Sequence, residues 1–135
     1  MKNGPSIALA TLFGLGVVLL PVASASPAND ACTALAGARI ALYSMVNAKD
    51  KSAQDALMAK LRSESDKLDS VLAGMTGTEA KVAADFKAIW DQFKATRDQE
   101  IIPAIYKGNA DDAKRIADGI QLDRLSKMWR IMSCK

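Results

Sequence analysis

The segment from Phe86 to Trp129 constrains the fold most, because it contains two long helical patterns joined at Gly108 and Asn109. Before this junction, apolar residues recur mostly three or four positions apart, as they do on one face of an α-helix. These residues are Val82, Phe86, Ile89, Trp90, Phe93, Ile101 and Ile105. Gly108 is suited to the left-handed conformation that ends a helix, and Asn109 can cap the next helix. The segment is therefore predicted to form a helical hairpin.

Residues 1–25 have the features of a secretory signal peptide. An apolar run, Ile7–Val22, is followed by the small-residue triplet Ala23–Ala25, which is typical of a cleavage site. The alternative is an uncleaved membrane anchor, since Pro5–Ala25 approaches the ~20 residues that span a bilayer. The triplet favours cleavage. We therefore expect a mature chain of residues 26–135 in the periplasm, with no membrane segment left.

The predicted mature chain is a single small domain. Its 110 residues carry 17 basic and 15 acidic side chains, because Lys2 is the one charged residue among the first 25. A chain of this size buries roughly two thirds of its surface on folding, which is enough for one hydrophobic core. The charges alternate in sign along the helical patterns, as on solvated faces, so binding to nucleic acid is not expected.

Four amphipathic helices are predicted, at about residues 31–47, 52–73, 78–107 and 110–133. No segment shows the alternating pattern of a strand. The connections between the helices are only a few residues long, and such connections make sequential helices antiparallel neighbours. The sequence therefore predicts an all-α fold, an antiparallel up-down-up-down four-helix bundle.

Polar residues near the helix starts suggest how the helices begin. Asn29 or Asp30 is expected to cap the first helix. The second helix begins with Ser52-x-x-Asp55, a weak variant of the capping box, and the third with the fuller motif Thr76-x-x-Glu79.

Two residues are expected to disturb the last two helices. Pro103 lacks an amide hydrogen and clashes with the preceding turn, so the third helix should kink or restart near Ile102. Gly119 either admits the close approach of a neighbouring helix or marks a bend. The core candidates of the fourth helix are Ala113, Ile116, Ala117, Ile120, Leu125, Met128, Trp129 and Met132.

The two cysteines are expected to form a disulfide. Cys32 lies at the start of the first helix and Cys134 at the end of the fourth, and the predicted topology places both at the same end of the bundle. An exported chain meets an oxidising compartment. The alternative is a pair of free thiols for metal or redox chemistry. It is disfavoured because the cysteines are 102 positions apart and no CxxC motif or histidine accompanies them.

No catalytic constellation is apparent, so we expect neither an enzyme nor a bound cofactor or metal. The chain has no histidine, which is the commonest general base, zinc ligand and proximal haem ligand. Four-helix-bundle cytochromes with covalent haem carry a CxxCH motif on the last helix, and this motif is absent around Cys134. A copper site formed by the three sulfur atoms of Met45, Met128 and Met132 is a further alternative. The competing interpretation is that these methionines fill the hydrophobic core.

The hairpin has a recognisable order of features: an aromatic-rich helix, an Ile-Ile-Pro segment, a Gly-Asn turn, alanine pairs and an arginine-bearing helix. The residues concerned are Phe86, Trp90, Phe93, Arg97, Ile101, Ile102, Pro103, Gly108, Asn109, Ala110, Ala113, Ala117, Gly119 and Arg124. In this order they resemble the periplasmic ligand-sensing four-helix bundle of methyl-accepting chemotaxis receptors. The resemblance covers about 55 residues, Ala80–Cys134. Those receptors continue into a second membrane span and signalling modules, whereas this sequence stops at Lys135, so the resemblance implies a stand-alone sensor-like module.

The resemblance also suggests where a ligand would bind, because such receptors hold ligands with polar residues, often arginines, on the first and fourth helices. Arg39 and Tyr43 lie one turn apart on the first helix, and Arg124 lies on the fourth. Together they could bind an anionic small molecule. The alternative for these three residues is surface charge beside a packed aromatic ring.

The expected function is therefore a periplasmic module that binds a small anionic molecule or a partner protein. The alternative is a structural or protein-interaction bundle without a small-molecule ligand. A homodimer through the first helix is also expected, as related sensory bundles dimerise there. The small residues that would allow close helix approach are Ala34, Ala36, Gly37, Ala38 and Ala41.

Overall fold

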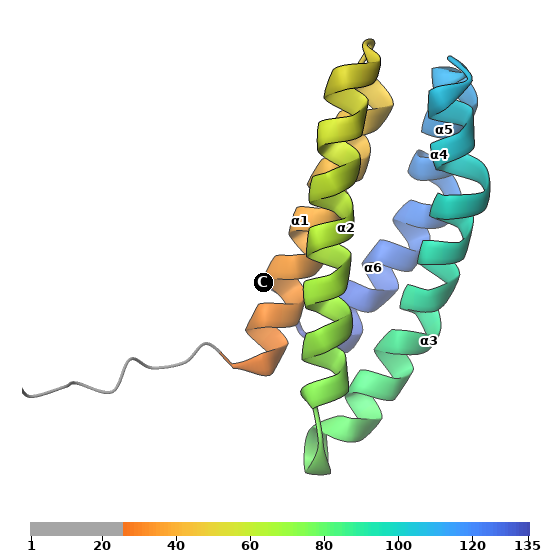
Figure 1. The fold of residues 1–135 in the computed structure, drawn as a ribbon. Helices are drawn as coiled ribbons and strands as arrows, with labels where there is room; N and C mark the ends of the chain where they lie inside the picture. Colours follow the sequence, from red (N-terminus) through yellow and green to blue (C-terminus); the bar gives the residue numbers. More distant parts are fainter. Residues whose placement is uncertain (1–25) are drawn as a thin grey trace, which may run out of the picture.

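The computed structural model describes residues 26–135, and within this range the chain is helical without strands (Figure 1). The signal peptide predicted for residues 1–25 lies outside the described residues. The first two helices are α1 (Pro27–Asn47) and α2 (Lys51–Gly74). After the 3-10 turn η1 (Gly77–Glu79), the third helix consists of α3 (Ala80–Thr96), η2 (Arg97–Ile101) and α4 (Ile102–Tyr106). The fourth consists of α5 (Ala110–Ile116), η3 (Ala117–Gln121) and α6 (Leu122–Ile131). The all-α class with four helices is confirmed.

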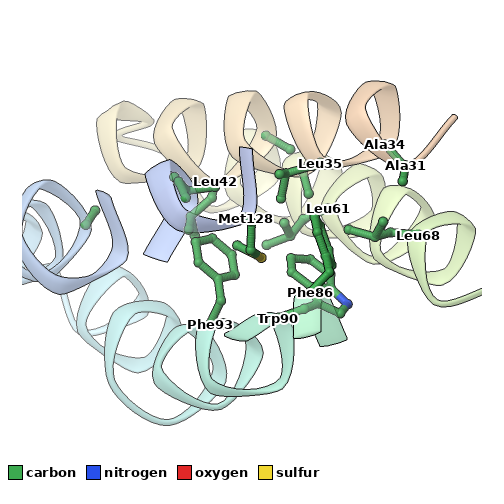
Figure 2. Packing of buried hydrophobic residues seen from close by; sticks show 14 of the residues in the cluster. Ala31, Ala34, Leu35, Leu42, Leu61, Leu68, Phe86, Trp90, Phe93 and Met128 are labelled. Carbon is green, nitrogen blue, oxygen red and sulfur yellow. The ribbon is translucent and has the colours of Figure 1, made fainter. Parts of the chain in front are cut away.

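The helices pack around one hydrophobic core. α1 packs closely on α2, α3 packs on α6, and α5 contacts both α4 and η2 (Figure 1). Figure 2 shows the aromatic residues of α3 pointing inward toward leucines of α1 and α2. The largest fully buried side chains are Trp90, Phe86, Phe93, Leu35, Leu42, Met45, Leu61, Leu68, Ile101, Met128 and Gln121. All of these except Gln121 are apolar, as expected for a core that is stabilised by burial of apolar surface.

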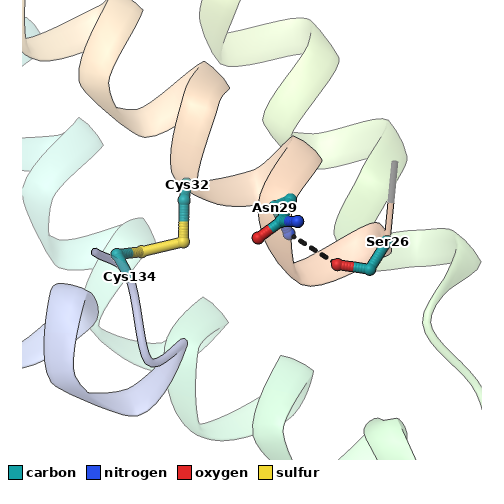
Figure 3. The surroundings of a disulfide bond; sticks show 4 residues. All are labelled: Ser26, Asn29, Cys32 and Cys134. Atoms are coloured by element: carbon teal, nitrogen blue, oxygen red, sulfur yellow. Dashed lines mark hydrogen bonds between the residues drawn. A yellow bond between two sulfur atoms is a disulfide. The ribbon is translucent and has the colours of Figure 1, made fainter. Parts of the chain in front are cut away.

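The first helix begins earlier than predicted, and the predicted cap is wrong. α1 starts at Pro27, and its cap is Ser26, whose hydroxyl accepts a hydrogen bond of 3.2 Å from the backbone amide of Asn29 (Figure 3). Asn29 and Asp30 therefore lie inside the first turn. Proline is favoured at the first helical position, where its missing amide hydrogen costs nothing, and this fixes the cap one residue before it.

The two predicted capping boxes are also wrong. α2 is capped by Asp50, whose carboxylate accepts from the amide of Ala53 at 2.8 Å. The Asp55 carboxylate instead accepts from the Lys51 ammonium and the Tyr106 hydroxyl, both at 2.8 Å. The side chain of Thr76 makes no capping hydrogen bond, and the chain enters α3 through the 3-10 turn η1.

Both disturbances expected in the last two helices are present as π-helical segments, η2 and η3. η2 ends directly before α4, which has Pro103 in its first turn, so the wider π turn accommodates the proline ring. In η3, Gly119 leaves the helical region with φ −95° and ψ −109°. A Cβ atom added to Gly119 would meet nothing within 4 Å. Gly119 therefore marks a bend and not a close helix approach.

The bend explains why one predicted core residue is wrong. Ile120 is 49% exposed, whereas Gln121 is fully buried. A π turn contains more residues than an α turn, so the face that a following residue occupies is rotated relative to a regular helix. Ile116 and Trp129 are half-buried, and the other core candidates of this helix are buried.

The predicted disulfide is present. Cys32 of α1 is bonded to Cys134, which follows the end of α6, with their Cα atoms 5.6 Å apart (Figure 3). The amide of Cys134 also donates to the carbonyl of Trp129 at 3.0 Å. The bond and this closing turn fasten the end of the fourth helix to the start of the first.

Substitution of Gly108 tests the turn of the hairpin. Gly108 has φ +78°, so Gly108→Ala is expected to lower the free energy of unfolding by about 1 kcal/mol, measured by urea denaturation. Gly74, the last residue of α2, is the matched control, because it lacks a positive φ and an added Cβ would meet nothing within 4 Å. Gly74→Ala should leave stability unchanged or raise it. Equal losses for both variants would contradict this assignment.

Candidate functional site

Two of the predicted ligand residues, Arg39 and Tyr43, lie together on α1. The Arg39 guanidinium carbon is 5.7 Å from the centroid of the Tyr43 ring, within the range of a cation–π contact. The Tyr43 hydroxyl donates a hydrogen bond of 2.6 Å to the carbonyl oxygen of Ala117, the first residue of η3. Tyr43 therefore links α1 to the irregular part of the fourth helix.

The environment of Tyr43 keeps its hydroxyl protonated. Burial raises the pKa of this phenol above its ordinary value, and the nearby Asp118 carboxylate raises it further. Arg39 and Lys114 act in the opposite direction. Because the pKa is raised overall, the hydroxyl is a neutral hydrogen-bond donor at neutral pH.

The third predicted ligand residue, Arg124, forms hydrogen bonds at the other end of η3. Its guanidinium donates to the Oγ1 atom of Thr96 at 2.6 Å and to the Oε1 atom of Gln121 at 3.0 Å. Tyr43 thus contacts the first residue of η3 and Arg124 the last. The structure places Tyr43 and Arg124 around one π-helical segment, and the Tyr43 hydroxyl and the Nη1 atom of Arg124 already have protein partners.

Sequence reasoning missed Gln121, which completes this network. Its side chain is fully buried and donates from Nε2 to the carbonyl oxygen of Phe93 at 2.9 Å. A buried amide of this kind needs such partners, because an unpaired polar group in the core is costly. Gln121 lies four residues after Ala117 and four before Leu125, both buried. This spacing was the signal in the sequence that Gln121 shares their buried face.

Arg97 of η2 forms a second buried polar cluster. Its side chain is 7% exposed and donates to both carboxylate oxygens of Asp98, at 2.7 and 3.1 Å. It also donates to the hydroxyl of Ser65 on α2 at 2.8 Å. The two π-helical segments are therefore held to the neighbouring helices by buried side-chain hydrogen bonds, an arrangement that supports a fixed geometry.

An open groove of about 1390 Å³ lies between α1 and α2. Trp129 and Lys135, which precede and follow Cys134 in the sequence, also line it. The side chain of Glu64 lies across Gly37, since a Cβ added to Gly37 would come within 2.8 Å of the Glu64 Cδ atom. Ile40, also in the lining, is 60% exposed, although it is a large apolar residue.

The small-residue surface expected on α1 is only partly free. Ala34, Ala38 and Ala41 are buried within the chain, where α1 packs closely on α2. Ala36 and Gly37 are half-buried and line the groove. Because Glu64 covers Gly37, most of the small residues of α1 serve packing inside the chain, and only Ala36 of the five remains available for another molecule.

Residues 26–135 contain neither a metal-binding cluster nor a helix that could cross a membrane. This range holds no group of three or more histidine, cysteine, aspartate or glutamate residues placed to bind a metal ion. Met45, Met128 and Met132, the residues of the alternative copper site, are buried in the hydrophobic core. No helix in the described part of the chain is long and apolar enough to cross a membrane.

Comparison with known proteins gives no further guide to the site. The chain matches no family model, no curated protein and no solved structure.

Proposed function

We propose that this chain is an exported binding module and not an enzyme, and that it binds through the groove between α1 and α2. The observation that carries the proposal is the groove itself, with its volume of about 1390 Å³. Pockets for small molecules usually enclose about 300–1,000 Å³ and bury most of the ligand. A larger and more open groove between two helices suits an elongated protein surface better than it suits a small molecule.

We infer that the four helices run up-down-up-down. α1 and α2 pack closely and are joined by only three residues, 48–50, which supports opposite directions for these two helices. The Gly108–Asn109 turn supports the same relation for the third and fourth helices. The bond between Cys32 and Cys134 then requires the start of the first helix and the end of the fourth to lie at one level.

In this arrangement the two ends of the groove differ in charge. Gly37 lies opposite Glu64, so Asp30 belongs to one end, near the disulfide, and Ile40 to the other. The end with Ile40 carries Lys60 and Arg62, whereas Asp30 and Asp66 lie toward the opposite end, together with Lys135. Lys67, also near that end, is paired with Glu64 at 3.2 Å.

This charge pattern supports a second copy of the chain as the occupant. A copy turned end for end brings the basic end of each groove against the acidic residues of the other, as a two-fold dimer requires. Ala36 lies near the middle, where its small side chain allows a helix of the other copy to approach closely. The exposed Ile40 of each copy would be covered, one at each end of the interface.

The proposed module acts in the periplasm. The disulfide suits an oxidising compartment. The likeness of the third and fourth helices to the sensing bundle of methyl-accepting chemotaxis receptors supports a binding role of the sensor type. A small anion held jointly by Arg39, Tyr43 and Arg124 is less well supported, because Tyr43 and Arg124 already bond within the chain.

The dimer is tested by sedimentation of the mature chain, residues 26–135, at increasing concentration. We expect a dimer at high micromolar concentration. Ile40→Glu should weaken association at least about tenfold, since the added carboxylate would face the acidic residues of the other copy. Ile120→Glu is the matched control, because Ile120 is similarly exposed but does not line the groove.

The control variant should associate as the unchanged chain does. A monomer at high micromolar concentration would contradict the proposed dimer and favour a bundle with another occupant in the groove. Equal association of both variants would place the dimer contact elsewhere.

A further inference from the structure

A second, smaller cavity of about 410 Å³ lies between the end of α2 and the start of α3. Its apolar lining includes Leu72, Met75 and Ala83, each only 6% exposed. The other apolar residues in the lining are alanines. Their small side chains leave space that larger side chains, such as the aromatic residues further along α3, would fill. The volume is within the usual range of small-molecule sites.

Two lysines of α3, Lys87 and Lys94, line the same cavity. The Lys94 ammonium donates to both carboxylate oxygens of Asp69, at 2.8 and 3.0 Å, and its side chain is only 24% exposed. The Trp90 indole also donates to Asp69 at 2.8 Å. The Asp69 carboxylate thus holds Lys94 in place and is itself fixed by the Trp90 indole.

Both ammonium groups retain capacity for a further acceptor. An ammonium has three N–H donors. Lys87 uses one on Asp91, at 2.5 Å, and Lys94 uses at most two on Asp69. The Lys94 ammonium also lies 3.5 Å from the Asp91 carboxylate, a longer contact that the carboxylate of a ligand would replace. The carboxylates of Asp69 and Asp91 are compensated by these lysines, which reduces their repulsion of an incoming anion.

We propose that this cavity binds a small amphipathic monocarboxylate. Its carboxylate accepts hydrogen bonds from Lys87 and Lys94, and its apolar tail packs on Leu72, Met75 and Ala83. An aliphatic chain of several carbons or a phenylalkanoate fits this chemistry. The partly buried position of Lys94 strengthens the charge-assisted hydrogen bond relative to one at a fully solvated lysine. This site is separate from the α1–α2 groove and does not depend on the dimer.

The experiment is a calorimetric titration of the mature chain with octanoate, compared with octanol and octylammonium. Octanoate is expected to bind saturably below about 1 mM, with the alcohol and the ammonium compound at least about tenfold weaker. Fluorescence gives a second readout, because Trp90 donates to Asp69 beside Lys94 and Lys94 lies over its ring at 5.5 Å. In a Trp129→Phe background, Trp90 is the only tryptophan in the chain.

Matched variants separate the site from general surface charge. Lys87→Gln should weaken octanoate binding about tenfold, whereas Lys81→Gln should leave it unchanged. Lys81 also lies on α3 and pairs with an aspartate four residues later, Asp85, but does not line the cavity.

A second pair of variants tests the apolar part. Ala84→Leu should fill the cavity and weaken octanoate binding at least about tenfold, and Ala95→Leu is its control on an exposed position of α3. Absence of octanoate binding up to about 1 mM would overturn the proposal. So would equal binding of octanol, or equal effects of a variant and its control. The oligomeric state measured by sedimentation is independent of all these outcomes.

Discussion

Reduction of the Cys32–Cys134 bond is expected to lower the free energy of unfolding by about 2–4 kcal/mol. The bond closes a loop across a sequence separation of 102 residues, for which the chain-entropy model gives up to ~4.7 kcal/mol. Measured effects of disulfides are usually smaller than this limit. The bond holds the start of α1 against the end of α6, so its loss should free the last turn of the fourth helix first.

Urea denaturation with and without dithiothreitol measures this effect. The double variant Cys32→Ser, Cys134→Ser is the control, because reductant should not change its stability. Its own stability should match that of the reduced chain. A loss below about 0.5 kcal/mol on reduction would show that packing alone fixes this end of the bundle.

Much of the architecture could be predicted because it depends on local periodicity. The aromatic residues predicted on one face of the third helix, Phe86, Trp90 and Phe93, are fully buried. The disulfide followed from the positions of two cysteines at predicted helix ends. The helix starts were less predictable, since Ser26 and Asp50 each compete with equally suitable polar neighbours for the same role.

Disturbances were predicted in the last two helices, but their π-helical form was not, although the sequence held a signal for it. Buried residues recur every four positions at Phe93, Arg97, Ile101 and Ile105, and again at Ala113, Ala117, Gln121 and Leu125. Three consecutive steps of four residues exceed the 3.6 residues of an α-helical turn. A single face can stay buried over such a run only if the helix is locally wider. Arg97 and Gln121 are polar and were therefore left out of the predicted stripes.

The candidate site could be predicted only in part for a related reason. Arg39 and Tyr43 were placed together because they are one turn apart on one helix. The groove and the smaller cavity depend on how two helices lie against each other, which no single stripe reveals. The position of Glu64 across Gly37, for example, joins residues of two helices and appears only in three dimensions.

Substitution of Trp90 should have the largest effect of any single side chain on stability. Trp90 is fully buried and stacks on Phe93 with ring centroids 5.4 Å apart. Trp90→Ala removes this packing and the indole hydrogen bond to Asp69, so a loss of about 3–5 kcal/mol in the free energy of unfolding is expected. Such a loss is comparable with the whole stability of many small domains.

Two further variants separate packing from the hydrogen bond. Trp90→Phe keeps most of the ring but removes the indole donor, and should cost less than Trp90→Ala. Ile89→Ala is the control on the adjacent, half-buried position, and should cost clearly less than Trp90→Ala because less apolar surface is lost. Urea denaturation of the three variants measures these losses. If Trp90→Ala cost no more than Ile89→Ala, the aromatic residues of α3 would not form the centre of the core, and the walls of the α2–α3 cavity would have to be held in place by Asp69 and Lys94 instead.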